Sequence, residues 1–268
     1  MLSIIITWRN RPELQRALSE SVPILSAFTL DWELLIVNGG GDLLVLQHLI
    51  ANVTSTRIQV IDVPSPTFNK AECINIGVAQ CRGDIVLLLD ADIIIEPSFP
   101  QVMMQALDDT SFVTVKTVFE TMPAPTDGFD PVTSFLKELI EITEFVGKDG
   151  RRASCEFRRG LDGSRCGPGI ILVHKNHFVQ IHGFNSTLRG WGFEDYDFQL
   201  RLQFALGLTR KTLHFATHIT HLPLSEKPQT DGENRLAAYK NYAGCCFDGT
   251  LEQDVQMFRG RAVQALTS

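Results

Sequence analysis

The sequence lacks the features that would place it in a membrane, a secreted or a nucleic-acid-binding class. No apolar run approaches the roughly 20 residues that a membrane-spanning helix needs. The start, MLSIIITWRN, has no basic segment ahead of a long apolar core, so we expect no signal peptide. Positive charge is scarce, and the net charge of −7 disfavours a general nucleic-acid binder. We therefore expect a cytoplasmic protein, a location compatible with peripheral association with a membrane.

The cysteines also lack a recognisable pattern. The chain has six, and they form neither a CxxC pair nor another zinc-binding spacing. Cys245 and Cys246 are adjacent, which is poor geometry for a disulfide between them. We expect free thiols in a reducing compartment. At 268 residues the chain is long enough to bury a large core without a disulfide or a metal.

Short apolar runs alternate with helical patterns in the first third of the chain. The runs are almost continuously apolar, as strands buried on both faces are. Between them, helix-start residues after Asn10 and the apolar spacing over residues 69–81 predict helices. Strands that alternate with helices predict a mostly parallel α/β sheet with right-handed crossovers. The expected strands cover residues 2–7, 32–37, 57–62 and 84–90.

The pattern loosens after Pro97. The segment SFLKELIEITEFV predicts an amphipathic helix over residues 134–146. Residues 147–165 lack apolar periodicity and are rich in arginine, so they are either a solvated loop or a mobile basic lid over an anionic ligand. The other expected elements are strands at 111–119, 168–173 and 212–217, a helix from about Glu194 to Leu206, and a polar tail over 226–268.

Two carboxylates stand where a buried strand is expected to end. In DIVLLLDAD, Asp90 and Asp92 follow a run of apolar residues. Open α/β sheets bind their ligands at such strand ends, although Asp is also common in a plain turn. The two side chains can reach one cation only if the backbone turns sharply between them. Since such a pair suits Mg²⁺ or Mn²⁺ that carries phosphate oxygens, we expect a divalent metal here.

The stretch RGWGFEDYDFQLRL places acidic residues behind a tryptophan that is flanked by glycines. Acids in the first turn of a helix interact favourably with its dipole, which accounts for Glu194, Asp195 and Asp197. It does not account for Trp191, which between glycines forms a flat platform suited to a sugar ring. A carboxylate beside that platform can accept a proton from a hydroxyl nucleophile. We expect Asp195 to be this base and Asp197 to be mainly structural.

Three histidines follow in HFATHITHLP, at positions 214, 218 and 221. Neutral imidazole is a frequent ligand for first-row metals, although a lone histidine is usually structural. His218 and His221 would point to opposite faces of an unbroken strand, so they converge only if a turn separates them. Pro223 favours such a turn. We expect His221, and with a turn also His218, to bind the metal.

These motifs, in this order, resemble nucleotide-sugar glycosyltransferases with the GT-A fold. The N-terminal half is similar to glycosyltransferase family 2 in SIIITWRNR, WELLIVNGGGD and FNKAECINIGVAQCRGDIVLLLDAD. The C-terminal half is similar to the β-1,4-galactosyltransferase and chondroitin-polymerase group in GPGIILVHKNHFVQIHGFNSTLRGWGFEDYDFQLRL and HITH. The resemblance covers roughly residues 2 to 225. It implies a single Rossmann-like GT-A domain over residues 1–268, with a nucleotide-sugar half (1–96), an acceptor and catalytic half (97–225) and a tail (226–268).

The resemblance also implies the reaction. It is an inverting, metal-dependent transfer of a sugar, with galactose or an N-acetylhexosamine favoured, from a UDP-sugar to an acceptor hydroxyl. Mn²⁺ is the favoured metal and Mg²⁺ the alternative. The implied partners are the UDP-sugar and a glycan, lipid-linked sugar, peptide or small-molecule acceptor, and the family allows a homodimer.

Each matching residue takes an implied role. Asp195 would be the general base, with Glu194 beside it. Trp191, Gly192 and Gly169 would shape the acceptor and sugar site. Asp92 and His221 would bind the metal, with His218 as a further ligand. The nucleotide-sugar site would be lined by Thr7, Arg9, Asn38, Lys70, Asn75, Asp84, Asp90, Ala91 and Asp92.

Two departures from the family pattern bear on specificity. The usual DDGS after the second strand is NGGG here, so Asn38 stands where the family has an acidic residue that contacts the nucleobase. An amide can still pair with uracil, but the base preference is left open. The usual GG before the acceptor strand is GPG at residues 167–169, which alters the expected acceptor contacts.

Three other classes fit parts of the pattern. A nucleotidyltransferase that acts on sugar phosphates would share the sheet and the metal carboxylates, but it leaves the WGFED block unexplained. A non-catalytic nucleotide-sugar-binding module would tolerate Asp195→Asn without functional loss. A glycoside hydrolase pairs carboxylates too, yet it needs neither the DAD motif nor a nucleotide pocket.

Overall fold

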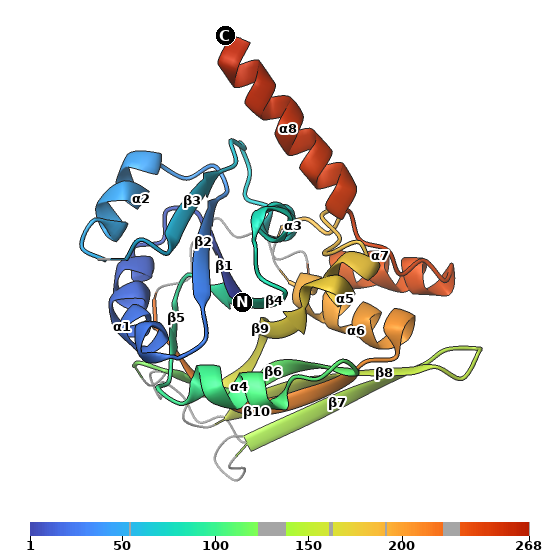
Figure 1. Ribbon diagram of the computed structural model, residues 1–268. Coiled ribbons are helices and arrows are strands. Elements are labelled where there is room, and N and C mark those ends of the chain that lie inside the picture. The colour runs from blue at the N-terminus through green and yellow to red at the C-terminus, as the bar shows by residue number, and fades with distance from the viewer. Residues whose placement is uncertain (54, 123–137, 161–162, 191, 222–230, 268) are drawn as a thin grey trace, which may run out of the picture.

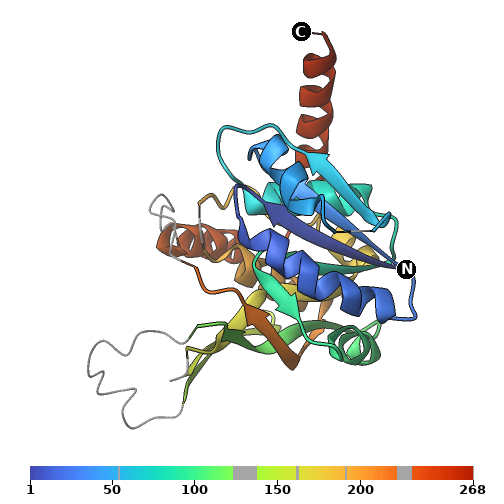
Figure 2. The same ribbon diagram turned by 90° about the vertical axis from the view of Figure 1, so that its left-hand side faces the viewer.

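The chain folds around one central sheet with helices on both faces (Figures 1 and 2). The computed structural model describes residues 1–53, 55–122, 138–160, 163–190, 192–221 and 231–267. Eight strands of the sheet follow the order β3-β2-β1-β4-β9-β6-β10-β5, and β7 and β8 form a ribbon joined to β9. Strands β1, β2, β3, β4, β6 and β10 run in one direction, so the predicted α/β class with a mostly parallel sheet is confirmed.

The first four strands form the parallel half of the sheet and match the four predicted from the sequence. Strands β1 and β2 are buried at every residue, because helices pack on both sides of them, and this explains their continuous apolar composition. Their bounds are β1 Leu2–Trp8, β2 Trp32–Asn38, β3 Ile58–Asp62 and β4 Ile85–Asp90.

Three helices connect these strands: α1 (Glu13–Ala27), α2 (Leu43–Ile50) and α3 (Lys70–Gln80). Helix α3 begins at Lys70 because the Asn69 side chain accepts a hydrogen bond from the backbone N–H of Glu72. Each of these helices starts just after the carboxyl end of a strand, so their N-termini gather at one edge of the sheet.

The second half of the sheet brings further strand ends to the same edge. Strand β9 (Arg165–His174) lies antiparallel between β4 and β6 (Ser111–Glu120), and β10 (Thr209–His218) runs parallel to β6. The carboxyl ends of β4, β6 and β10 and the amino end of β9 therefore meet at one edge. The short strand β5 (Ile93–Ile95) pairs antiparallel with β10, and α4 (Phe99–Ala106) follows it.

Helix α6 (Glu194–Leu206) covers one face of the sheet beside α3 and α5 (Lys175–Gln180), and its bounds match the prediction. Its Phe198 ring stacks on Phe184 with a centroid distance of 4.2 Å, and both rings are fully buried. Burying a phenylalanine side chain contributes about 1.5–3 kcal/mol. This contact anchors the helix whose first turn carries the predicted base.

The ribbon of β7 (Glu138–Val146) and β8 (Arg152–Gly160) differs from the prediction. The two strands pair along their whole length, and Arg152–Glu144 and Arg158–Glu138 ion pairs join them. The expected helix is therefore wrong over 138–146, and residues 134–137 lie outside the described residues. The expected loop or lid at 147–165 is wrong over 152–160, because cross-strand pairs stabilise an extended arginine-rich strand.

The predicted polar tail is helical where it is described. It contains two helices, α7 (Asp231–Ala243) and α8 (Leu251–Thr267). The first turns of α8 pack Leu251, Val255 and Phe258 against the core that includes α3, and its far end projects from the body (Figure 1). Within the described ranges, we find no helix with the length and apolarity that a bilayer crossing requires. All six cysteines are free thiols, as expected.

Candidate functional site

The predicted site residues gather where the carboxyl ends of β4, β6 and β10 meet the N-termini of α3 and α6. Strand β4 ends at Asp90, and Ala91 and Asp92 form a turn before β5. This is the sharp backbone turn that the DAD motif requires if its two carboxylates are to act together. Asp90 faces the N-terminus of α3, and Asp92 faces the end of β10.

Asp92, His218 and His221 form a cluster that fits a metal ion. Their candidate ligand atoms all lie within 4.8 Å of one another. The Oδ2 atom of Asp92 lies 3.1 Å from Nε2 of His221 and 3.4 Å from Nε2 of His218. One carboxylate and two imidazoles are a donor set that divalent first-row metals prefer. The histidines converge because β10 ends at His218, so the two rings do not lie on opposite faces of an unbroken strand.

Glu120, the last residue of β6, orients His218. Its Oε2 atom lies 2.6 Å from Nδ1 of His218 and also accepts a hydrogen bond from the Thr220 hydroxyl. Burial lowers the pKa of His218, but its hydrogen bonds to Asp92 and Glu120 outweigh this and raise that pKa. A carboxylate on the far nitrogen fixes the ring and directs Nε2 toward Asp92, as carboxylates that bond the other ring nitrogen of a metal-binding histidine do.

Asp92 is held as a carboxylate. Burial alone would raise its pKa, but hydrogen bonds from His218 and His221 and the charge of Arg11 outweigh burial and lower that pKa. An ionised Asp92 is the form that binds a divalent cation.

Two arginines follow the end of β1, and one of them, Arg11, borders this cluster. The Nη1 atom of Arg11 lies 3.0 Å from Nδ1 of His221. Arg9 donates from Nη2 to the Pro66 carbonyl, while its buried Nη1 has no hydrogen-bond partner. Guanidinium groups beside a candidate metal site suit phosphate oxygens.

Lys70 is the centre of a second cluster. Its Nζ lies 2.8 Å from Asp90, 3.0 Å from Asp195 and 4.0 Å from Glu194. Burial would lower the pKa of Lys70, but the three carboxylates outweigh it and raise that pKa well above its usual value. The lysine is therefore a fixed positive charge between the end of β4 and the first turn of α6.

Asp195 has the properties of a general base. Burial raises its pKa, Lys70 lowers it, and the negative charges of Glu194 and Asp90 raise it, so that together these effects raise the pKa to about 7. Its Oδ2 atom bonds Lys70, while its buried Oδ1 has no hydrogen-bond partner. A carboxyl group with one open oxygen and a pKa near neutrality can take up a proton under physiological conditions.

Gly169 lets these groups approach one another. A Cβ atom at this position would lie 2.8 Å from Nζ of Lys70, 2.9 Å from Oδ2 of Asp90 and 3.0 Å from Oδ2 of Asp195. Glycine is therefore the one residue type that fits this point of β9 without displacing a charged group. The motif GPG keeps the glycine that the site needs.

The loop before α6 is shaped by unusual backbone angles. Gly192 has a φ of 108°, and Phe193, the N-cap of α6, has a φ of 70°. The N–H of Gly192 donates to Glu194, and its carbonyl accepts from Asn234 of α7. Glu194 thus holds the loop as well as facing Lys70. Trp191 lies outside the described residues, so its role as a sugar platform stays a prediction.

Asp197 is structural, as the sequence analysis anticipated. It is 1% exposed and forms an ion pair of 2.7 Å with the equally buried Arg201 one turn later. Its other oxygen accepts a hydrogen bond from the Tyr242 hydroxyl of α7. Both oxygens are engaged within the protein.

Thr7, Asn38 and Ala91 lie at the same sheet edge and are buried. Thr7 pairs in register with Asp90 across β1 and β4. Asn38 bonds both the N–H and the carbonyl of Gly41 and donates to Asp62, so it holds the turn after β2. Contact of Asn38 with a nucleobase stays a prediction.

Two predicted nucleotide-site residues lie elsewhere. Asp84 precedes β4, at the opposite end of the strand from Asp90, and its side chain is 92% exposed near the N-terminal amine. Six strand residues at about 3.3 Å each separate it from the site. Asn75 is fully buried, and its amide bonds Phe184 and Asp254. Both assignments are corrected, because neither side chain faces the clustered carboxylates.

Arg11 and Glu120 were missed by the sequence analysis. The signal for both was their position, since each lies at or just after the carboxyl end of a strand. Strand order was needed to show that these two ends lie beside His221 and His218.

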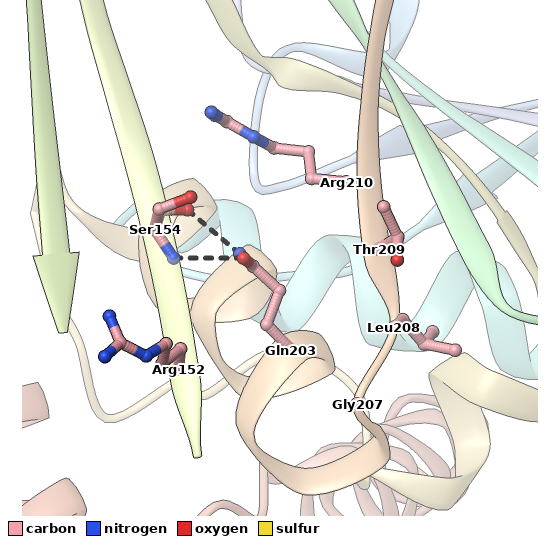
Figure 3. Close-up of a pocket in the computed structure, with 7 residues that line it drawn as sticks. All are labelled: Arg152, Ser154, Gln203, Gly207, Leu208, Thr209 and Arg210. Carbon is pink, nitrogen blue, oxygen red and sulfur yellow. Dashed lines mark hydrogen bonds between the residues drawn. The ribbon is translucent and has the colours of Figure 1, made fainter. Parts of the chain in front are cut away.

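A pocket among the described residues lies away from both clusters. It has a volume of about 330 Å³ and is lined at the C-terminal end of α6 (Figure 3). Gln203 in its wall is eight residues from Asp195, which is about 12 Å along a helix. Its amide is engaged by the backbone of Ser154 in β8. The pocket therefore belongs to the packing of the ribbon against α6.

Comparisons with known families agree with the two halves seen in the sequence. A family model described as "Glycosyl transferase family 2" matches residues 3–149, more than half of the chain. A second model, described as the N-terminal domain of galactosyltransferase, matches residues 150–223. No curated protein matches the sequence.

Several solved structures share the fold at low sequence identity. GalNAc-T7 with UDP, GalNAc and Mn²⁺ is 13% identical with a TM-score of 0.59 over 90% of this chain and 47% of that one. S. aureus TarS in complex with UDP-GlcNAc is 11% identical with a TM-score of 0.54, over 97% and 72%. A Drosophila β-1,4-galactosyltransferase 7 mutant in complex with manganese, UDP-Gal and xylobiose is 16% identical with a TM-score of 0.51, over 87% and 77%. The chain thus spans about half the length of the GalNAc-T7 structure, and the likeness shows a shared GT-A fold.

Proposed function

The chain belongs to glycosyl transferase family 2, and from this premise we propose that it is an inverting, metal-dependent enzyme that moves a sugar from a UDP-sugar to an acceptor hydroxyl. The observation that carries the proposal is the adjacency of two clusters on one DAD turn. Asp92 joins two histidines, and Asp90 joins Lys70 and Asp195. One turn therefore links a candidate diphosphate site to a candidate base.

The metal-binding cluster would serve the leaving group. A divalent ion held by Asp92, His218 and His221 would supply Lewis-acid stabilisation of the charge that develops on the diphosphate. Arg11 would add positive charge beside it. The family resemblance and the Mn²⁺ in the GalNAc-T7 structure favour Mn²⁺, with Mg²⁺ as the alternative.

Asp195 would act on the acceptor. Its open Oδ1 atom accepts the proton of the acceptor hydroxyl while that oxygen attacks the anomeric carbon. The bond from the anomeric carbon to the phosphate oxygen breaks at the same time, and UDP leaves with the bonding electrons. A single displacement from the opposite face inverts the configuration. Lys70 holds the base in place through its contact with Oδ2.

The donor and acceptor are proposed at the level of chemical class. The structures with a similar fold were solved with UDP, UDP-Gal or UDP-GlcNAc, so we propose a UDP-hexose or UDP-N-acetylhexosamine donor. The acceptor would be a glycan, lipid-linked sugar, peptide or small molecule. The division into nucleotide-sugar and acceptor halves, the cytoplasmic location and the homodimer stay predictions.

A nucleotide-release assay tests the proposal. The chain is incubated with a panel of UDP-sugars and candidate acceptors, with Mn²⁺, Mg²⁺ or a chelator, and free UDP is measured. We expect release from at least one donor that an acceptor accelerates and a chelator abolishes. In a parallel reaction with UTP and sugar 1-phosphates in place of the UDP-sugars, release of pyrophosphate would instead support a nucleotidyltransferase. Tight UDP-sugar binding without any turnover would support a binding module.

A further inference from the structure

Asp254, in the first turn of α8, is a buried carboxylate outside the site described above. It is 0% exposed. Its Oδ2 atom accepts hydrogen bonds from Asn75 at 2.6 Å and from the Thr250 hydroxyl at 2.9 Å, and its Oδ1 accepts from the Ser186 hydroxyl at 2.7 Å. All three donors are uncharged. Burying a carboxylate in this way costs free energy that hydrogen bonds must offset, so its position calls for a reason.

The partners of Asp254 connect α8 to the N-terminus of α3. The Ser186 carbonyl accepts a hydrogen bond from Asn69, which is the N-cap of α3. Asn75, six residues further along the chain in α3, bonds the backbone N–H and carbonyl of Phe184 as well as Asp254. The segment from Phe184 to Ser186 is therefore hydrogen-bonded to α3 at two points, Asn69 and Asn75. Lys70, the residue after the cap, is held in the same arrangement.

The same segment is also tied to α6. Arg201 of α6 donates to the carbonyls of Ile181 and Gly183, and the residue is 1% exposed. Arg201 in turn pairs with Asp197 in the first turn of α6, two residues beyond Asp195. Residues 181–186 thus bridge the helix that carries Lys70 and the helix that carries Asp195. Asp254, on the third helix α8, bonds this bridge through Ser186.

We propose that Asp254 is a positioning residue, which acts through Ser186 and Asn75 to set the distance between Lys70 on α3 and Asp195 on α6. The proposal rests on the proposed function, because it assigns Asp254 to the geometry of that reaction. A carboxylate suits this point because it accepts from the Asn75 N–H and from two hydroxyls at once. An asparagine would present an N–H group to one of these partners, so a hydroxyl would have to reverse its hydrogen bond and give up its present orientation, which loosens the bridge.

The test uses Asp254→Asn and the milder Ser186→Ala, which removes one of the three donors and leaves the other two. Gln253→Ala is the matched control, because that residue is exposed and next to Asp254 in the same helix. We expect kcat for UDP release to fall by about 10²-fold in Asp254→Asn, as a misplaced catalytic group causes, with the affinity for Mn²⁺ unchanged. Ser186→Ala should show a smaller loss, and combining it with Asp254→Asn should add little.

The pH profile separates positioning from simple stability. Asp195 is faced by Lys70 from α3, by Asp90 from β4 and by Glu194 on its own helix. If the bridge loosens and Lys70 moves away from Asp195, the carboxyl group loses the positive charge that favours its ionised form, and its pKa rises. The acidic limb of kcat should then move to higher pH in both variants and stay in place in Gln253→Ala.

The outcomes are distinguishable. A variant that folds, by circular dichroism and thermal unfolding, and keeps kcat and its acidic limb overturns the inference. If Asp254→Asn does not fold, Ser186→Ala decides. If the wild-type chain releases no UDP from any donor, the proposed function fails instead. In that case, backbone amide hydrogen exchange in the first turn of α3 tests the inference. We expect less protection in the variants than in the wild type, and unchanged protection overturns the inference.

Discussion

The Nζ atom of Lys70 lies 3.0 Å from the Oδ2 atom of Asp195, and both side chains are largely buried. This contact joins the first residue of α3 to the first turn of α6. It leaves the other oxygen of Asp195 open, because Oδ1 has no partner. The pair therefore combines a fixed cation with a carboxylate that can still accept a proton.

The first prediction concerns pH. Burial and the neighbouring charges together raise the pKa of Asp195 to about 7, and a base must be deprotonated to act. We expect kcat to rise with pH through about 7, since Asp195 is protonated and inactive below that value. The measurement is kcat for UDP release from mildly acidic to mildly alkaline buffer at saturating donor and metal. A flat profile across this range would contradict Asp195 as the base.

The second prediction concerns Glu120, which the sequence analysis did not single out. Glu120→Gln should weaken Mn²⁺ binding by about 10–100-fold, because the carboxylate orients His218 from behind. Titration calorimetry with Mn²⁺ alone measures this without reference to turnover. Glu141→Gln, on the exposed face of β7, is the control and should bind as the wild type does. Equal affinity in the two variants would remove Glu120 from the metal site.

The third prediction concerns Gly169. Gly169→Ala should lower kcat by about 10²-fold, because the added Cβ pushes against Lys70, Asp90 and Asp195 and misplaces the base. Overpacking of this kind costs about 1–3 kcal/mol, so the variant should remain folded. Gly260→Ala in α8, where a Cβ meets nothing within 4 Å, serves as the control. Full activity in Gly169→Ala would show that the cluster is looser than described.

The fourth prediction separates structure from catalysis in the acidic first turn of α6. Asp197→Asn should lower the free energy of unfolding by about 3–5 kcal/mol, because it leaves Arg201 buried without its partner charge. Activity per folded molecule should change far less than in Asp195→Asn. Chemical denaturation and kcat, measured on the same sample, check both parts. The surface variant Glu233→Gln should be neutral in both.

Much of the site followed from strand-end logic. Asp90 and Asp92 could be placed in the candidate site because they follow a buried apolar run. Asp195 was singled out from the neighbouring Gly-Trp-Gly, and its role as the base stays a prediction. The convergence of His218 and His221 was anticipated on the condition that the strand is interrupted, and the two side chains do lie together. The assignment of Asp84 to the nucleotide site was wrong because the family resemblance matches residue types and does not say which end of a strand faces the ligand.

The ribbon and the C-terminal helices were beyond the sequence reasoning for physical reasons. The segment at 138–146 has apolar residues at helical spacing, but its β-branched residues and its cross-strand charge pairs with β8 favour a strand. The apolar residues of α8 that pack against the core are Leu251, Val255 and Phe258, which give little signal in the sequence until the surface of α3 is known. Asp254 could not be assigned at all without that contact.

The measurement that tests the central claim most directly compares Mn²⁺-dependent UDP release by the wild type and by Asp195→Asn. A general base contributes about 10²–10⁴-fold, so kcat should fall by that factor. The affinity for UDP and Mn²⁺ should be retained, because the metal cluster at Asp92 is untouched. Wild-type turnover in Asp195→Asn, or turnover that a chelator leaves intact, would contradict the account.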